Sequence, residues 1–596
     1  MGGDAPPRRS EVGAGAELSE DDPSGRVVRV LPDVAAVDRA FDYEVPTKFA
    51  DAVSVGSVVR VDLHGRRVRG WVIAEGAGAP GVGLKPVTRV SGFGPPVDVL
   101  DLAAWASWRW AGPRASFLRT ASPPANVTRL PARAGRQIAA PAEAAPAWVR
   151  KAFALDRAVA RVAPAVDPWP VISAGAALGP ALVLVPSRAR AARLVTRLRA
   201  AGTETALMPD DWASAAAGGR VVVGTRAAAW APCPDLAAVV VVDAHDEVYE
   251  EERAPTWNAW RVAAERARRA AAPCVLTTAC PSVEQLAWGE LVATPREEER
   301  RGWSKLEVVD RRGDDPRTGL WSERLVAAAR DAERVVCVLN RKGRAKRLAC
   351  AACGEMANCT RCGAAIGQDE REILTCPRCS EERPLVCAVC GSAKLKSLRL
   401  GTARAVEELG ALVDRPVGEV TAGTEQLPDA AVLVGTEAVL HRVGRADLVI
   451  FVDFDAELAA PHYRSGEAAL TLLARASRLT RGRTGDGRVL VQTRQPDHPA
   501  ILAALAADPT RLTNAEHDVR SLLQFPPYAA LALVSGEASP AYAEALRVDA
   551  RVTVQGPDPS GRWLVRADDH TALCDALVAT PRPSGRLRVA VDPLRA

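Results

Sequence analysis

The chain has 596 residues, which is enough for about four domains at ~150 residues each. Its apolar content of 48% and charged content of 25% are those of a globular protein, and a net charge of +5 does not by itself indicate a nucleic-acid partner. No apolar run approaches the roughly 18 residues of a membrane span, and the N-terminus lacks an apolar signal segment. We therefore expect no membrane contact and a cytoplasmic location.

The first quarter of the chain predicts a tail, a small β domain and a helical region. Residues 1–25 are rich in Gly, Pro, Ser and acidic residues and are expected to be a disordered tail. Short apolar runs separated by glycines then predict a small barrel or sandwich over residues 26–96. Residues 97–165 have a mostly helical pattern, and a helical domain beside a barrel suggests a winged-helix-like domain. The expected β strands are Val27–Leu31, Phe41–Val45, Ser57–Val61 and Val68–Ala74.

Two α/β units follow, and the alternation of strands and helices predicts a parallel, doubly wound sheet in each. We assign them to residues 166–293 and 294–510, the second interrupted by an insertion at 350–390. Residues 511–596 predict a C-terminal α+β domain. The expected strands of the two lobes are Ala181–Val185, Val221–Gly224, Ala237–Asp243, Val275–Thr278, Val335–Leu339, Ala431–Gly435, Leu448–Asp453 and Val489–Thr493.

The insertion holds eight of the thirteen cysteines, arranged as four C-x-x-C pairs. Each such turn can present two thiolates to one tetrahedral ion, and two turns make a closed four-cysteine zinc site. Clustered pairs in a chain that looks cytosolic favour metal over disulfides. We therefore predict two Zn²⁺ ions as cofactors. The predicted ligands are Cys350, Cys353, Cys359, Cys362, Cys376, Cys379, Cys387 and Cys390.

The four turns can be paired in two ways. Thirteen residues separate Cys362 from Cys376, a gap that suits one site made by the two inner pairs. The outer pairs would then make the other site, and we adopt this nested assignment. Alternation of the pairs in a cross-brace remains the alternative. In the nested assignment the first zinc ion is held by Cys350, Cys353, Cys387 and Cys390, and the second by Cys359, Cys362, Cys376 and Cys379.

Two tandem α/β lobes suggest a nucleotide-driven motor, which needs a Gly-rich loop with Lys and Ser or Thr to hold phosphates and Mg²⁺. No lysine occurs between Lys151 and Lys305. The glycine-bearing stretch Ser173–Pro180 is expected to be a loop that passes directly into a strand. ATP and Mg²⁺ are therefore not expected as cofactors, and no catalytic residue is assigned.

From Arg26 to its end, the chain resembles the PriA family of replication-restart helicases. Phe41-Asp42-Tyr43 is similar to an F-D-Y segment of the family, and the four C-x-x-C pairs match in number and order. Each motif is weak alone, but their shared order makes chance negligible. Further matching motifs are Val223-Gly224-Thr225-Arg226, Leu339-Asn340-Arg341-Lys342-Gly343, the segment from Asp453 to Glu467, and Asp592-Pro593.

The resemblance implies helicase-like lobes and a barrel that cups the free 3′ end of a DNA strand. Asp42 would accept a hydrogen bond from the 3′-hydroxyl, Phe41 or Tyr43 would pack against the nucleotide, and Gly65 would lie in the next hairpin. The alternative for Phe41 and Tyr43 is that they are strand residues with one face in the core. The implied partners are branched DNA and replication forks, single-stranded DNA, and other primosome or replisome proteins at the nucleoid.

Departures from the family pattern fall on the motor motifs. The D-E-E-H box is reduced to Asp243-Ala244-His245-Asp246. Arg478 and Arg481 of a later motif remain, but its glutamine and glycines are replaced. We therefore expect a zinc-containing, DNA-binding restart protein without helicase activity. The alternatives are a residual ATP-dependent 3′-to-5′ DNA helicase and a zinc-ribbon scaffold that binds no DNA.

Overall fold

The computed structural model describes two compact units, one made of residues 1–104 and 113–131 and the other of residues 105–112 and 132–596. None of the described helices is both long and apolar enough to cross a bilayer. The predicted tail lies outside the described residues up to residue 22. Described are residues 23–595 except 35–36, 77–82, 136–144, 315–318, 340–347, 354, 356, 358, 362–365, 369–372, 377–380, 398–401 and 422.

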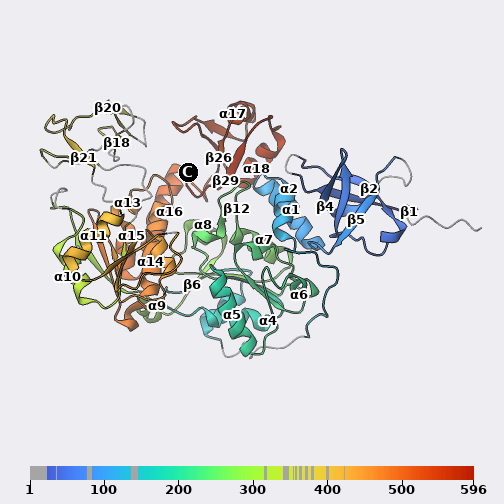
Figure 1. The fold of residues 1–596 in the computed structure, drawn as a ribbon, viewed down its shortest axis with the longest axis horizontal. Coiled ribbons are helices and arrows are strands. Elements are labelled where there is room, and N and C mark those ends of the chain that lie inside the picture. The colour runs from blue at the N-terminus through green and yellow to red at the C-terminus, as the bar shows by residue number, and fades with distance from the viewer. Residues whose placement is uncertain are drawn as a thin grey trace, which may run out of the picture. The chain divides into compact units, whose positions relative to one another are not determined.

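The N-terminal unit is built on a five-stranded antiparallel sheet in the order β2-β1-β4-β3-β5, drawn in blue in Figure 1. Buried valines such as Val28, Val59 and Val72 fill its inner face. A bridge between Glu44 and Pro86 joins its two edges, so the sheet curls into the predicted barrel, here half closed. The strands are β1 (Pro23–Pro32), β2 (Phe41–Pro46), β3 (Val58–Leu63), β4 (Arg66–Glu75) and β5 (Val87–Gly92).

Helix α2 (Arg114–Ala121) belongs to the same unit as the half-barrel. The indole of Trp71 donates to Ser122 Oγ at 2.8 Å, and Arg119 pairs with Asp33 at 2.5 Å. These contacts extend the unit to Pro131, well beyond the predicted end at residue 96.

Residues 97–165 do not form a domain of their own, which differs from the winged-helix prediction. Helix α1 (Val97–Arg109) is divided between the two units. Helix α3 (Ala147–Phe153) and strand β6 (Arg157–Arg161) belong to the larger unit, where β6 pairs in parallel with β13 and β14. A buried run as short as Ala158-Val159-Ala160 cannot be recognised as a strand from its periodicity.

The first α/β lobe contains a seven-stranded sheet in the order β14-β6-β13-β10-β7-β9-β8, and every pairing in it is parallel. Its apolar strands are buried on both faces, as expected when helices cover a parallel sheet. The strands not yet given are β7 (Ala181–Leu184), β8 (Thr205–Leu207), β9 (Val221–Gly224), β10 (Ala238–Val241), β13 (Cys274–Thr278) and β14 (Glu290–Ala293). The helices are α4 (Trp169–Leu178), α5 (Arg188–Ala200), α6 (Trp212–Ala217), α7 (Ala259–Arg269) and α8 (Val283–Trp288), and a short hairpin is made by β11 (Glu250–Glu251) and β12 (Trp257–Asn258).

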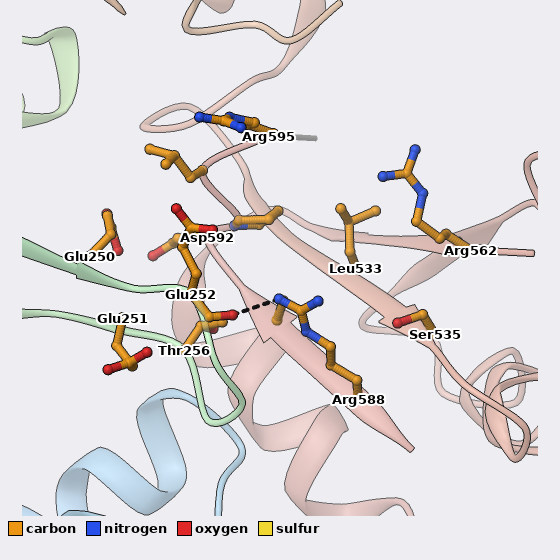
Figure 2. Close-up of a pocket in the computed structure, with 13 residues that line it drawn as sticks. Glu250, Glu251, Glu252, Thr256, Leu533, Ser535, Arg562, Arg588, Asp592 and Arg595 are labelled. Atoms are coloured by element: carbon orange, nitrogen blue, oxygen red, sulfur yellow. Dashed lines mark hydrogen bonds between the residues drawn. The ribbon is translucent and has the colours of Figure 1, made fainter. Parts of the chain in front are cut away.

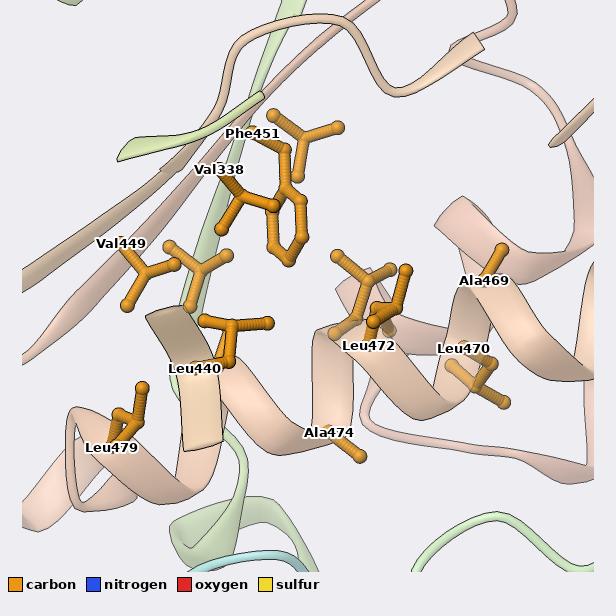
Figure 3. Close-up of a cluster of buried hydrophobic side chains, with 14 of the residues drawn as sticks. Val338, Leu440, Val449, Phe451, Ala469, Leu470, Leu472, Ala474 and Leu479 are labelled. Atoms are coloured by element: carbon orange, nitrogen blue, oxygen red, sulfur yellow. The ribbon is translucent and has the colours of Figure 1, made fainter. Parts of the chain in front are cut away.

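The second lobe contains a six-stranded sheet in the order β15-β25-β24-β16-β23-β22, again parallel throughout. Figure 3 shows its core, where Phe451 of β24 points toward Leu472 of α14. The predicted class, α/β with two tandem parallel-sheet lobes, is confirmed. The strands are β15 (Lys305–Asp310), β16 (Val335–Val338), β22 (Val417–Val420), β23 (Val432–Gly435), β24 (Leu448–Phe451) and β25 (Arg488–Thr493). The helices are α9 (Arg296–Gly302), α10 (Glu323–Asp331), α11 (Thr402–Val413), α12 (Ala438–Arg442), α13 (Asp455–Leu458), α14 (Ser465–Leu479) and α15 (Pro499–Ala506).

The cysteine-rich insertion lies between β16 and α11 and has its own small sheets and core. The C-terminal residues form the predicted α+β arrangement, with an antiparallel sheet in the order β27-β28-β26-β29. The strands of the insertion are β17 (Leu348–Cys350), β18 (Gly367–Gln368), β19 (Ile373–Thr375), β20 (Glu382–Pro384) and β21 (Leu395–Ser397). The C-terminal elements are α16 (Thr510–Leu523), β26 (Ala530–Ser535), α17 (Ser539–Leu546), β27 (Thr553–Gln555), β28 (Trp563–Ala567), α18 (His570–Ala579) and β29 (Arg588–Val591).

Candidate functional site

Strand β2 places three of the predicted DNA-binding residues on alternating faces of the half-barrel. Tyr43 is only 3% exposed, and its hydroxyl donates to the main-chain oxygen of Asp62 at 3.1 Å. Phe41 is half-buried at the edge of the same core, and the guanidinium of Arg39 lies 4.6 Å from its ring centroid. Tyr43 and Phe41 therefore both lie on the core-facing side of β2, as the alternative for these strand residues predicts. Phe41 is the less buried of the two aromatic candidates.

Asp42 points away from that core and is held by Arg29. The Nε and Nη2 atoms of Arg29 donate to its two carboxylate oxygens at 2.9 and 3.2 Å. This bidentate pairing fixes the plane of the carboxylate. Each oxygen keeps a second lone pair, so the group can still accept a hydrogen bond from a hydroxyl.

Gly65 lies in the two-residue turn that joins β3 to β4. His64 and Gly65 both adopt left-handed conformations, with φ of 50° and 77°, as a tight hairpin turn requires. The carboxylate of Asp62 accepts from Gly65 N at 3.1 Å and from Lys85 Nζ at 2.5 Å, and Lys85 lowers the pKa of Asp62. A Cβ on Gly65 would meet no atom within 4 Å, so the turn geometry accounts for the glycine.

The insertion brings together the two outer C-x-x-C pairs. The sulfur atoms of Cys350, Cys353, Cys387 and Cys390 all lie within 4.8 Å of one another. Two of the distances are 3.5 Å (Cys350 to Cys390) and 3.6 Å (Cys353 to Cys387). Four sulfurs around one zinc ion, with Zn–S bonds of about 2.3 Å, would lie about 3.8 Å apart. The cluster therefore has the size and donor set of a tetrahedral thiolate site.

Backbone amides prepare these sulfurs to act as thiolates. Ala352 N donates to Cys350 Sγ, and Val389 N donates to Cys387 Sγ, both at 3.4 Å. The amide of Cys353, together with that of Ala352, lowers the pKa of the Cys350 thiol to about 6. By contrast, burial in the lobe core raises the pKa of the Cys337 thiol to about 12. Within the cluster the pKa of Cys387 is also lowered by backbone amides, whereas the neighbouring thiols raise the pKa of Cys353 to about 12, so the four sulfurs titrate as a group.

The inner C-x-x-C pairs are only half described. Cys359 and Cys376 are buried in one small apolar cluster, whereas Cys362 and Cys379 lie outside the described residues. Cys376 N donates to Glu381 O at 2.9 Å. The outer turns contain the same bond to the residue five positions later, from Cys350 N to Glu355 O and from Cys387 N to Ser392 O. The third turn therefore has the backbone geometry of the two turns that form the sulfur cluster.

The loop of the first lobe that would hold phosphates in a nucleotide-driven motor is not where the sequence predicts it. Residues 173–178 belong to helix α4, so the predicted loop at Ser173–Pro180 is wrong for most of its length. Gly175 is needed for close packing, since a Cβ there would meet Val240 at 2.9 Å. The connection from a parallel strand into a helix is Val162–Pro168, between β6 and α4. This loop contains neither glycine nor lysine.

Asp243, at the end of β10, is paired with arginines from both lobes. Arg190 Nη1 donates to its Oδ2 at 2.6 Å, and Arg478 of α14 donates to both carboxylate oxygens at 2.6 Å. Burial would raise the pKa of Asp243, which is only 5% exposed, but Arg478 and Arg190 hold it well below its usual range. The Nε of Arg478 also donates to Pro164 O at 2.8 Å, within the loop after β6. A single arginine thus joins the strand-end acid to the loop where phosphates would bind in a motor.

Further ion pairs join the two lobes. Arg475 pairs with Asp246 at 3.0 Å. Glu284 of the first lobe accepts from Arg464 of the second at 2.6 Å, and from Arg261 at 2.8 Å. Arg464 and Arg261 offset the cost of burial and lower the pKa of Glu284 to about 2. These ion pairs thus join the two lobes through side chains that are largely buried.

A separate pocket of about 150 Å³ lies between the β11–β12 hairpin and the C-terminal sheet (Figure 2). Acidic residues line one wall and arginines another, and Arg588 donates to the main-chain oxygen of Glu252 at 2.6 Å. None of the site residues predicted from the sequence lines it. The pocket is therefore not part of either predicted site.

The half-barrel, the two parallel lobes and the cysteine insertion define the class of a helicase-like DNA-binding protein. Residues 29–123 match the family model of the 3′DNA-binding domain (3′BD) of PriA. The chain is 28% identical over 562 residues to the probable replication restart protein PriA of Mycobacterium tuberculosis, which covers 85% of this chain and 86% of that one. The predicted resemblance to the PriA family is thereby confirmed.

Other comparisons cover less. The replication restart protein PriA of Bacillus subtilis is 28% identical over 401 residues, which are 60% of this chain and about half, 49%, of that one. A DEAD box protein from Methanococcus jannaschii has a TM-score of 0.30 and 10% identity, covering 62% of this chain and 88% of that one. A structural likeness of this size adds nothing to what the sheets themselves show.

Proposed function

We propose that the chain is a DNA-binding replication-restart protein that recognises stalled or abandoned replication forks and helps to reload the replisome, without helicase activity. The match of residues 29–123 to a 3′DNA-binding domain carries this proposal. The carboxylate of Asp42, oriented by Arg29 away from the barrel core, supports a role in holding a 3′-hydroxyl. Its partners would be forks, single-stranded DNA and other primosome or replisome proteins, at the nucleoid in the cytoplasm.

Zinc belongs to this proposal as a structural cofactor. The outer cysteine pairs would hold one ion and the inner pairs a second, so that each insertion contains two. The sulfur spacing in the outer cluster and the amide bonds to Cys350 and Cys387 support the first site. The backbone geometry at Cys376 supports the second. Bound zinc would stabilise a segment whose own apolar core is small.

The absence of ATP hydrolysis is proposed from the cleft between the lobes. Phosphoryl transfer requires an amide cradle and a lysine for the phosphates, a strand-end acid for Mg²⁺ and a free arginine across the cleft. The loop Val162–Pro168 supplies no glycine or lysine. The acid and the arginine, Asp243 and Arg478, are present but bind each other.

The retention of that same pair favours the second candidate, a residual ATP-dependent 3′-to-5′ helicase in which ATP would separate Asp243 from Arg478. Measurement of ATP turnover in the presence of fork DNA distinguishes the two functions. We expect no stimulation over protein alone. Turnover that is stimulated by forks and abolished in Asp243→Ala would establish the helicase and refute our proposal.

The barrel role predicts that Asp42→Ala removes discrimination between fork ends. The wild type is expected to bind a fork with a 3′-hydroxyl roughly 10-fold more tightly than one with a 3′-phosphate, because a hydrogen bond to a charged group contributes about 1.5 kcal/mol. Fluorescence anisotropy with the two forks measures the ratio. Asp51→Ala, an exposed aspartate of the same unit, is the matched control and should keep it. An unchanged ratio in Asp42→Ala would remove this role from the barrel.

A further inference from the structure

Three arginines lie side by side across the outer face of the half-barrel. Arg60 of the middle strand β3 is directly opposite Arg69 of β4 on one side and Arg89 of β5 on the other. Directly opposite residues point to the same face of a sheet and are about 5 Å apart. Their neighbours along β3, Val59 and Val61, are buried in the barrel, so the arginine row faces outward.

This arrangement is electrostatically unfavourable in the protein alone, since like charges directly opposite each other destabilise a sheet. Four other basic residues of the unit form ion pairs with carboxylates. Among the described residues, Arg60, Arg69 and Arg89 have no carboxylate within ion-pair distance. The pairs formed elsewhere are Arg26–Glu75, Arg29–Asp42, Lys85–Asp62 and Arg119–Asp33.

Arg69 gives a second, independent sign of a missing partner. Its side chain is half-buried, and its Nε atom is enclosed without a hydrogen-bond partner among the described residues. Burial lowers the pKa of Arg69, the nearby carboxylate of Asp33, which pairs with Arg119, raises it, and the charges of Arg119 and Arg60 lower it. The charge of Arg69 thus has no ion pair among the described residues, and a phosphate on the outer face would supply one to its guanidinium.

We propose that Arg60, Arg69 and Arg89 bind the phosphodiester backbone of the DNA strand that the barrel receives. The inference rests on the proposed function and adds a second contact to it, distinct from the one at Asp42. Guanidinium groups bind phosphates bidentately, and a row of three can hold consecutive phosphates of one strand. Such contacts would set the register of the strand and carry no sequence preference, which suits a protein that must act on any fork.

The test is the salt dependence of fork binding by the full chain carrying Arg60→Gln, Arg69→Gln and Arg89→Gln. Loss of three phosphate contacts should lower the slope of log affinity against log salt by about 2 to 3, and weaken binding roughly 100-fold at about 0.1 M salt. The preference for a 3′-hydroxyl over a 3′-phosphate should remain, because Asp42 is intact. Replacement of the same residues by lysine should restore most of the slope.

Two further variants make the result decisive. The charge control carries three substitutions at exposed positions of the lobes: Arg193→Gln, Arg300→Gln and Arg334→Gln. It has the same change in net charge and should leave the slope of log affinity against log salt unchanged. Arg60→Gln with Arg89→Gln, both exposed, repeats the test if loss of Arg69 disturbs the barrel. A folded triple variant with wild-type slope and affinity overturns the arginine row but leaves the proposed function standing. A wild type that binds no fork at all overturns both.

Discussion

Simultaneous replacement of Cys350 and Cys387 by serine should leave about one zinc ion per chain, whereas the wild type should contain two. In the nested arrangement both residues belong to the same sulfur cluster, so the second site survives. In a cross-brace they would belong to different sites, and both ions would be lost. Structural zinc contributes on the order of 10 kcal/mol to folding, so the insertion should become sensitive to protease when its first site is removed. Metal analysis and limited proteolysis measure the two effects.

The control for this experiment is Cys337→Ala. Cys337 is fully buried in β16, and its raised pKa makes it a thiol of the lobe core, so its loss should leave the zinc content unchanged. Cys359→Ser alone should also reduce the zinc content to one ion per chain, because it removes a ligand of the second site. Wild-type protein that contains no zinc when purified without chelator would refute the assignment of all eight cysteines.

Arg478→Ala should destabilise the pair of lobes by about 2 to 4 kcal/mol. Removal of Arg478, whose side chain is 36% exposed, leaves the buried carboxylate of Asp243 with Arg190 as its remaining ion-pair partner. The carbonyl of Pro164 would also lose its donor. Denaturant-induced unfolding followed by tryptophan fluorescence measures the change. Arg483→Ala, an exposed arginine beyond the end of the same helix, should change stability by about 0.5 kcal/mol or less.

The same pair predicts how this loss depends on pH. The folded-state pKa of Asp243 is held below its ordinary value, so its stabilisation is present above the unfolded pKa of about 4 and is lost as the pH falls further. The Arg478→Ala variant lacks most of this stabilisation. The difference in unfolding free energy between wild type and variant should therefore become smaller as the pH is lowered from neutral to strongly acid. A difference that is small at pH 7, or constant with pH, would show that the pair does not hold the lobes together.

The sequence predicts the structure best where a repeated pattern is compatible with only one arrangement of strands and helices. Strand–helix alternation predicts both lobes, because apolar strands buried on both faces leave few other arrangements. The spacing of the cysteines leaves two pairings open, and the sulfur cluster at Cys350 and Cys387 agrees with the nested one. Tyr43 was ambiguous because an aromatic residue on a strand can face either the core or a ligand, and only its register decides between them.

The prediction failed where short segments are defined by tertiary contacts. The sequence predicts a loop at Gly175, but this glycine lies in α4 and allows the helix to approach Val240 closely. Strand β6 is too short to show a period, so the sequence predicts a helical domain there. The sequence analysis does not predict the arginine row, although part of its signal is visible: Arg60 stands between two valines in β3, and Val68 stands between two arginines in β4. Alternation shows that they face outward, but only the strand pairing shows that they are neighbours.

The bond from Arg478 to both Asp243 and Pro164 also bears on when such a protein acts. In a motor, the two lobes open and close as ATP binds and is hydrolysed, and this cycle times the release of DNA and partners. Here Arg478 itself links Asp243 and the carbonyl of Pro164 in the first lobe to helix α14 in the second. Under the proposed function, release from a fork would then require displacement by another molecule and would not follow the ATP level of the cell.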